Sequence, residues 1–120
     1  MPGQKQVLIV EDEKPLAHAL ELKLQHEGMA TTIATNGEDC LKILREKHID
    51  VVLLDMMMPV MDGFQVLQEI NKFSVKPTVF VLSNLSVHDD QAKVMALGAK
   101  KYFIKSDTSL ATIVDEVKQA

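Results

Sequence analysis

Residues 51–63 read VVLLDMMMPVMDG, and this stretch decides the fold. The run VVLL is apolar at every position, which is typical of a parallel strand that is covered on both faces. The run stops at Asp55, and Pro59 with the pair Asp62–Gly63 then predicts a turn into a helix. The stretch therefore predicts a buried strand that presents one carboxylate at its carboxyl end.

Four other runs of strand length accompany this one. The predicted strands are Gln6 to Val10, Ala30 to Ala34, Val51 to Leu54, Thr78 to Leu82 and Lys101 to Ile104. The runs VLIV and VFVL are also apolar without alternation, whereas ATTIA carries threonines and fits an edge strand, as does KYFI.

Segments of helical period separate these strands. They are Pro15 to Glu27, a segment through Cys40, Leu41 and Leu44 after the turn Asn36–Gly37, Gly63 to Lys72, Val87 to Leu97, and about Ser109 to Gln119 with Asp107 or Thr108 as its N-cap. Five strand–helix repeats predict an α/β fold, a (βα)5 doubly wound parallel sheet. In such sheets ligands bind beyond the carboxyl ends of the strands.

The composition describes one ordinary domain. The chain has 120 residues, 47% of them hydrophobic, and 17 acidic against 13 basic residues. This charge gives no basic field for nucleic-acid phosphates or anionic lipid, so we expect no direct nucleic-acid partner. The first residues contain no membrane span, and the lone Cys40, predicted to be a core residue, suits a reducing compartment. We therefore expect a cytoplasmic location.

Polar side chains collect at the strand ends. The first strand is followed by Glu11, Asp12 and Glu13, the third by Asp55, the fourth by Ser83 and the fifth by Lys105. If the carboxylates converge, each close pair costs about 4 kcal/mol at an effective dielectric near 20, so a positive charge must offset the repulsion. A hard divalent cation, Mg²⁺ or Mn²⁺, does so and suits phosphate chemistry.

A rigidly held Asp55 in such a site can act as a nucleophile. With a metal to hold an incoming phosphoryl group, and Ser83 and Lys105 to bind its oxygens, the carboxylate can form an acyl phosphate.

At these residues the chain resembles the response-regulator receiver domains of two-component signalling. The resemblance runs through VLIVEDE, LLDMMMPVMDG, VLSN and YFIK, in the order and spacing of that family. It implies the flavodoxin-like strand order 2-1-3-4-5, for which the edge-like ATTIA is the independent support. It also implies that Asp55 accepts a phosphoryl group from a histidine kinase or phosphotransfer protein.

The resemblance assigns further roles residue by residue. Asp12 becomes the direct metal ligand beside Asp55, with the main-chain carbonyl of Met57, and Glu11 acts through water. Ser83 senses the phosphoryl group, Lys105 pairs with it, and Tyr102 is the aromatic switch residue. A hydrogen bond from Ser83 to the phosphoryl group is worth roughly 1.5 to 3 kcal/mol, enough to shift a two-state loop.

The expected output is a change of surface. Inward movement of Tyr102 alters the face made by the fourth helix, the fifth strand and the fifth helix, which a downstream effector protein or, after phosphorylation, a second copy reads. Residues 1–120 are expected to be a single receiver domain without an output domain. It is not a conventional enzyme, but is expected to catalyse its own phosphorylation and autodephosphorylation.

Several positions depart from the family pattern. Ser106 stands where the family has a proline joined through a cis peptide, so the isomer of that bond stays open. Asn84 is larger than the usual small residue. Met57 and Leu85, both apolar, occupy positions that tune the lifetime of the acyl phosphate, and we expect them to shield it from water.

Three other functions are alternatives. A receiver-like scaffold that binds partners without phosphorylation is made conceivable by Ser106 and Asn84. An aspartyl-phosphate phosphohydrolase needs a general acid two residues after the nucleophile, where Met57 stands. A flavin-binding module needs a Ser/Thr/Gly-rich phosphate loop after the first strand, where EDEKP repels phosphate.

Overall fold

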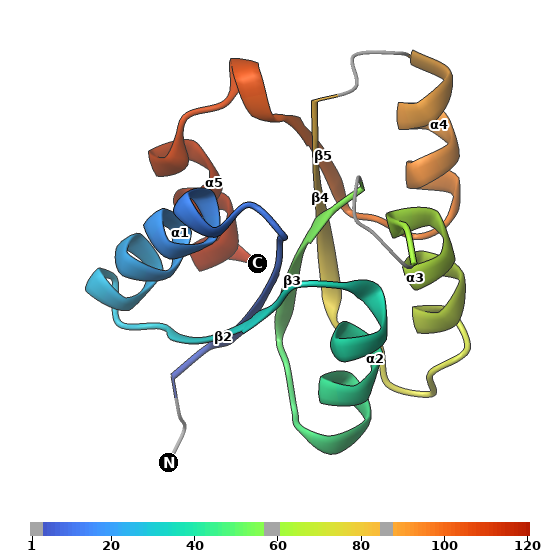
Figure 1. Ribbon diagram of the computed structural model, residues 1–120, viewed down its shortest axis with the longest axis horizontal. Helices are drawn as coiled ribbons and strands as arrows, with labels where there is room; N and C mark the ends of the chain where they lie inside the picture. The colour runs from blue at the N-terminus through green and yellow to red at the C-terminus, as the bar shows by residue number, and fades with distance from the viewer. Residues whose placement is uncertain (1–3, 57–60, 85–87) are drawn as a thin grey trace.

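A computed structural model describes residues 4–56, 61–84 and 88–120. The chain alternates strands and helices throughout (Figure 1). Its strands are β1 (Gln6–Val10), β2 (Ala30–Ala34), β3 (Val51–Asp55), β4 (Thr78–Ser83) and β5 (Lys101–Ile104). Its helices are α1 (Lys14–His26), α2 (Gly37–Glu46), α3 (Gly63–Ile70), α4 (His88–Ala96), the 3₁₀ turn η1 (Lys105–Asp107) and α5 (Leu110–Gln119).

The strands form one parallel sheet in the order β2-β1-β3-β4-β5, which confirms the predicted fold class and strand order. The order reverses direction at β1, which lies between β2 and β3. Crevices that bind ligands form at such a reversal in open α/β sheets. The register pairs Val10 of β1 with Leu54 of β3, so Glu11, which follows β1, and Asp55, the last residue of β3, lie side by side.

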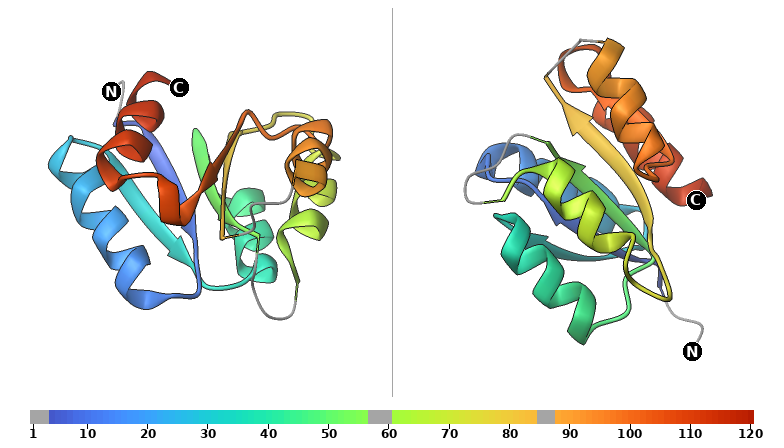
Figure 2. Two further views of the ribbon diagram at one scale, coloured as in Figure 1. Left: turned by 90° about the horizontal axis from the view of Figure 1, so that it is seen from above. Right: turned by 90° about the vertical axis from the view of Figure 1, so that its right-hand side faces the viewer.

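Helices cover both faces of the sheet (Figures 1 and 2). Alternate strand residues such as Leu8 and Leu54 pack with α2, α3 and α4, while their neighbours, such as Ile9 and Leu53, pack with α1 and α5. Every residue of β3 is buried. This two-sided burial explains why the central strands are apolar without alternation.

Small polar residues fix the helix starts. Asp62 and Gln65 form a reciprocal capping box on α3, and Asn36 accepts a hydrogen bond from the Asp39 backbone at the start of α2. The N-cap of α5 is Ser109, which accepts from Thr112 N at 3.1 Å, so the expected caps Asp107 and Thr108 are wrong. Asp107 is the last residue of the 3₁₀ turn and Thr108 follows it, so the turn displaces the helix start.

Element ends differ from the sequence prediction by one or two residues. Strands β3 and β4 each extend one residue further, through Asp55 and Ser83, because both residues stay in register with the neighbouring strand. Helix α1 spans Lys14–His26 instead of 15–27, α3 stops at Ile70 instead of Lys72, and α4 spans His88–Ala96. Position 87, the predicted start of α4, lies outside the described residues.

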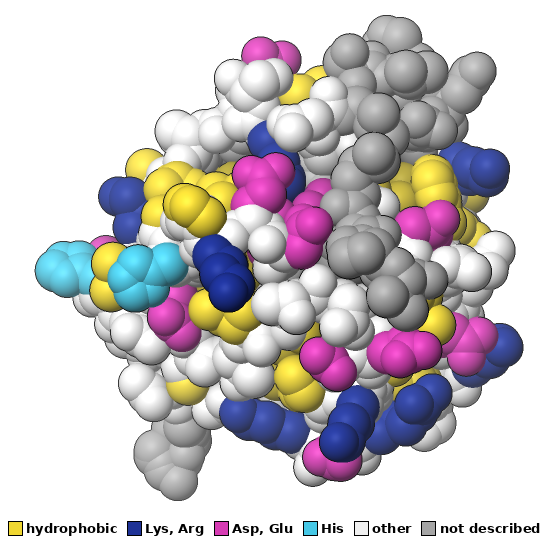
Figure 3. All heavy atoms as spheres, in the orientation of Figure 1, with side chains coloured by type: hydrophobic (Ala, Val, Ile, Leu, Met, Phe, Trp, Pro, Cys, Tyr) yellow, Lys and Arg dark blue, Asp and Glu magenta, His cyan; other side chains and the backbone are white. Residues whose placement is uncertain are grey.

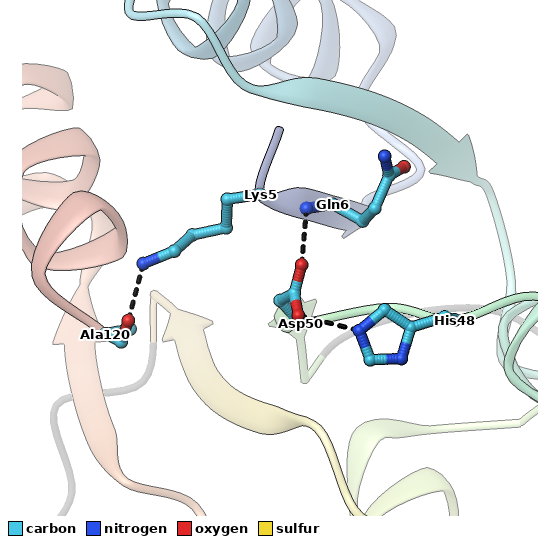
Figure 4. A network of polar contacts seen from close by, with 5 residues as sticks. All are labelled: Lys5, Gln6, His48, Asp50 and Ala120. Carbon is cyan, nitrogen blue, oxygen red and sulfur yellow. Dashed lines mark hydrogen bonds and ion pairs between the residues drawn. The ribbon is translucent and has the colours of Figure 1, made fainter. Parts of the chain in front are cut away.

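The amino edge of the sheet carries a polar network (Figure 4). Lys5 Nζ donates to the carbonyl oxygens of Val117 (3.0 Å), Lys118 (2.9 Å) and Ala120 at the end of α5. Asp50 accepts from Gln6 N at 2.7 Å and contacts His48 Nε2 at 2.8 Å. These contacts tie β1 to α5 and to the start of β3.

Cys40 lies in the core, as the sequence predicts. Burial raises the pKa of its thiol to about 12, which makes it a poor nucleophile. Within the described part of the chain, none of the helices has the length and apolar character needed to cross a bilayer.

Candidate functional site

The predicted site residues meet at the carboxyl edge of the sheet. Asp55 and Ser83 are the last residues of β3 and β4, while Glu11 and Lys105 directly follow β1 and β5. Because the strands are parallel, their ends lie at one edge. On the face seen in Figure 3, acidic side chains gather around a basic one near the top of the molecule, beside the grey residues.

Lys105 is the centre of this site. Its Nζ lies 2.8 Å from Glu11 Oε1, 3.3 Å from Asp55 Oδ2 and 3.8 Å from Glu13 Oε1. The Lys105 side chain is only 10% exposed, so these contacts form in a partly desolvated environment. There, ion pairs are stronger than at an open surface.

Two acids of the site, Glu11 and Asp55, and the hydroxyl of Ser83 are more buried than the lysine. Glu11 and Asp55 are each 1% exposed, and Ser83 is fully buried. One carboxylate oxygen from each of Glu11, Asp12 and Asp55 lies within 4.8 Å of the others, although Asp12 itself is exposed. The structure thus brings together the acids that the sequence predicts to converge.

Burial raises the pKa of Glu11 to about 7; the neighbouring Asp55 carboxylate adds to the rise, and Lys105 opposes it. Burial lowers the pKa of Lys105, but the close contact with Glu11 and the charge of Asp55 outweigh this effect and leave it raised. The raised pKa of Glu11 thus reflects the unfavourable free energy of ionising a carboxyl that is buried beside another acid.

A divalent cation fits this donor set. The site offers three carboxylates whose oxygens are close enough to share one ion, and hard cations prefer such oxygen ligands. Buried Glu11 Oε1 approaches the Lys105 ammonium at 2.8 Å without the angles of a regular hydrogen bond, so the contact is an ion pair. The residues that would hold Mg²⁺ are Asp12, Asp55 and Glu11, while Met57, whose carbonyl is the fourth predicted ligand, lies outside the described residues.

The remaining predicted residues take several positions. Tyr102 is half-buried in β5, opposite Val81 of β4, and packs against the core that α2, α3 and α4 cover. Asn84 and Ser106 are exposed. The Lys105–Ser106 peptide is trans, which settles the isomer that the sequence left open. Leu85, like Met57, falls outside the described residues.

Glu13 is the residue to which the sequence assigned no role. It is the N-cap residue of α1, and its backbone N–H donates to Glu11 Oε2 at 3.1 Å. Its place directly after Glu11 and Asp12 signals proximity to the acids. No sequence pattern, however, indicates that its side chain turns toward Lys105, ninety-two positions away along the chain.

Known proteins resemble this chain in sequence. A family model described as the response regulator receiver domain matches residues 7–118. A probable transcriptional regulator, ycf27, of Cyanidium caldarium is 40% identical over 102 residues, which cover 85% of this chain and 41% of that protein. The chain thus spans about two-fifths of the length of this curated relative.

Solved structures agree with the family match. The receiver domain of the Francisella response regulator 1452 superposes with a TM-score of 0.91 at 27% identity, covering 97% of this chain and 95% of that one. The phosphorylated cyanobacterial phytochrome response regulator RcpA gives a TM-score of 0.84 at 26% identity, with 98% and 91% covered. The chain therefore belongs to the response regulator receiver domains of two-component systems.

Proposed function

We propose that the chain is a phosphorylation-controlled switch in which Asp55 is the phospho-acceptor. The observation that carries this proposal is the position of the Asp55 carboxylate, which is buried at the end of β3, 3.3 Å from Lys105 and beside two further acids. A carboxylate fixed in this way needs no reorganisation before it attacks phosphorus.

The transfer step is a displacement at phosphorus. One Asp55 oxygen forms a bond to phosphorus while the bond from phosphorus to the leaving atom of the donor breaks. The leaving group keeps the electron pair of that bond. Lys105 and the Ser83 hydroxyl bind phosphoryl oxygens and offset their charge. Bound Mg²⁺ would supply further neutralisation of the phosphoryl oxygens, held by Asp12 and Asp55 with Glu11 acting through water.

The donor is a histidine kinase or a phosphotransfer protein. Support for this comes from the family and from one of the similar structures, a receiver that was solved in its phosphorylated form. The chain then supplies the catalytic groups for its own phosphorylation and autodephosphorylation, without turning over a free substrate as a conventional enzyme does. Residues 1–120 act as a single receiver domain in the cytoplasm.

Ser83 and Tyr102 relay the signal. Ser83 ends β4, and Tyr102 lies on the adjacent strand β5, so a hydrogen bond from Ser83 to the phosphoryl group pulls on the segment that leads toward α4. Tyr102 then turns inward and changes the α4-β5-α5 face, where an effector protein or a second phosphorylated copy binds. Met57 and Leu85 shield the acyl phosphate and prolong the signal.

Intact mass spectrometry tests the proposal. The protein is incubated with acetyl phosphate, with and without Mg²⁺, alongside Asp55→Asn and a control, Asp39→Asn, on the exposed start of α2. We expect a Mg²⁺-dependent phosphate adduct in the wild type and the control, and none in Asp55→Asn. Wild-type protein that binds Mg²⁺ yet forms no adduct would overturn the switch and favour the scaffold function.

A further inference from the structure

Glu13 places a carboxylate at the outer rim of the site. Its side chain is 58% exposed, in contrast to the buried Glu11 and Asp55. It is the N-cap residue of α1, yet its side chain accepts no capping hydrogen bond from the described backbone of that helix. Instead its Oε1 lies 3.8 Å from Lys105 Nζ. The carboxylate thus lies toward Lys105, which also contacts Asp55, and does not cap the helix.

This rim borders a cavity that leads to Lys105. The cavity has a volume of about 260 Å³, and Glu13 and Lys105 line it together with Leu16, Asn84 and Leu110. A small donor that approaches Asp55 from this side passes the Glu13 carboxylate. Glu13 and Asp55 both contact Lys105 Nζ, so their nearest oxygens are at most about 7 Å apart, well within one screening length at physiological salt.

The charge balance of the site is unfavourable to anionic donors. Glu13 adds a fourth carboxylate to the three that can share one ion, and Lys105 contacts three of the four, Glu11, Asp55 and Glu13. Even a bound divalent cation together with Lys105 leaves excess negative charge while Glu13 is present. A donor that carries two negative charges meets more repulsion there than a donor whose leaving nitrogen is protonated.

We propose that Glu13 determines phosphodonor specificity, disfavouring small dianionic acyl phosphates relative to donors that transfer their phosphoryl group from a protonated nitrogen. This inference rests on the proposed function. With an acyl phosphate, the P–O bond to the carboxylate breaks and the carboxylate leaves with the electron pair. With phosphoramidate, the P–N bond breaks and the nitrogen leaves as ammonia with the electron pair and the protons that it already carries. With a phosphohistidine, the P–N bond breaks and the ring nitrogen keeps the electron pair, while the proton stays on the other ring nitrogen, so a neutral imidazole leaves.

The test compares two small donors under the same conditions. Initial rates of Asp55 phosphorylation are measured by intact mass with acetyl phosphate, a dianion, and with phosphoramidate, whose nitrogen is protonated near neutral pH. The variants are Glu13→Gln, Glu13→Asp, which keeps the charge, and Glu46→Gln. Glu46 is exposed at the end of α2, near the start of β3, so this last variant removes the same charge far from the site.

We expect Glu13→Gln to raise the acetyl phosphate rate about threefold and the phosphoramidate rate less than twofold, since the repulsion scales with donor charge. High salt should reduce the difference in rate between Glu13→Gln and the wild type. Glu13→Asp should keep the wild-type preference between the two donors, and Glu46→Gln should change neither rate. Equal changes with both donors, or none, would overturn the role of Glu13. A wild type that neither donor phosphorylates would overturn the proposed function itself.

Discussion

The ammonium of Lys105 lies closer to Glu11, at 2.8 Å, than to the Asp55 carboxylate, at 3.3 Å. Lys105 is therefore shared between Glu11, the buried acid after β1, and Asp55, the candidate acceptor. To bind a phosphoryl oxygen on Asp55, Lys105 must weaken its contact with Glu11. A cation that engages Glu11 favours this exchange, which links metal binding to phosphorylation through one side chain.

Replacing Asp55 should stabilise the fold while it abolishes the phosphate adduct. In the absence of divalent metal, Asp55→Asn removes one of the mutually repelling buried charges and keeps an oxygen that can accept from Lys105. We expect the free energy of unfolding to rise by about 1 kcal/mol in urea titrations with a chelator present. A variant less stable than the wild type would show that Lys105 fully offsets the carboxylates.

Mg²⁺ should raise the melting temperature, because an ion that binds the folded chain and not the unfolded one stabilises it by mass action. At a free Mg²⁺ concentration one hundred times the dissociation constant, the gain in unfolding free energy is about 2.7 kcal/mol. Asp12→Asn should reduce the gain at a given Mg²⁺ concentration, while Asp39→Asn should leave it unchanged. Thermal unfolding with increasing Mg²⁺ measures the effect, and equal responses in all three proteins would exclude the acid cluster as the metal site.

Gly63→Ala should destabilise the segment that follows Asp55. A Cβ at Gly63 would lie 2.8 Å from the Met56 Cα, a backbone atom that cannot move without shifting the residue next to Asp55. We expect a loss of about 2 kcal/mol in unfolding free energy, together with slower phosphorylation of Asp55. Gly28→Ala is the comparison: its φ of +86° is strained for alanine, but no atom lies within 4 Å, so stability should fall without a change in phosphorylation rate.

Asp50 should contribute stability that is lost in acid. The hydrogen bond from the Gln6 backbone, and the neighbouring His48 and Lys5, lower its pKa in the folded chain despite partial burial. An acid with a lowered folded pKa stabilises the fold above its unfolded pKa of 3.8 and loses this contribution as the pH falls through the folded value.

Asp50→Ala should therefore cost about 1 kcal/mol of unfolding free energy at pH 7 and progressively less below pH 4. Urea titrations of both proteins between pH 3 and pH 7 provide the measurement. A cost that stays constant across this range would mean that the lowered pKa does not contribute.

The sequence predicts the sheet well because strands that are buried on both faces are apolar at every position. The apolar runs around Ile9, Leu53 and Val81 place three central strands, and the threonines of ATTIA mark an edge. The order of the strands is predicted from the family resemblance, since an apolar run does not indicate which strands lie beside it in the sheet. Helix ends were less accurate: Asp107, Thr108 and Ser109 are all good caps, and the intervening 3₁₀ turn decides among them.

For the site, the sequence predicts which residues gather but not how they pair. The ends of parallel strands must meet, so the grouping of Glu11, Asp55 and Lys105 followed from their positions in the chain. The closer contact of Lys105 with Glu11 and its approach to Glu13 depend on side-chain directions across several elements. Such directions are set by packing and leave no periodic signal.

The contact of Lys5 with the end of α5 also has a consequence for the order of folding. Lys5 and Val117 are separated by 112 positions, so closing that loop is entropically costly until the intervening strands have paired. The last turn of α5 should therefore dock late and open first. In hydrogen exchange, the amides of this turn should open locally at a much lower free energy than those of β3. The turn is therefore a sensitive probe of local opening in the folded domain.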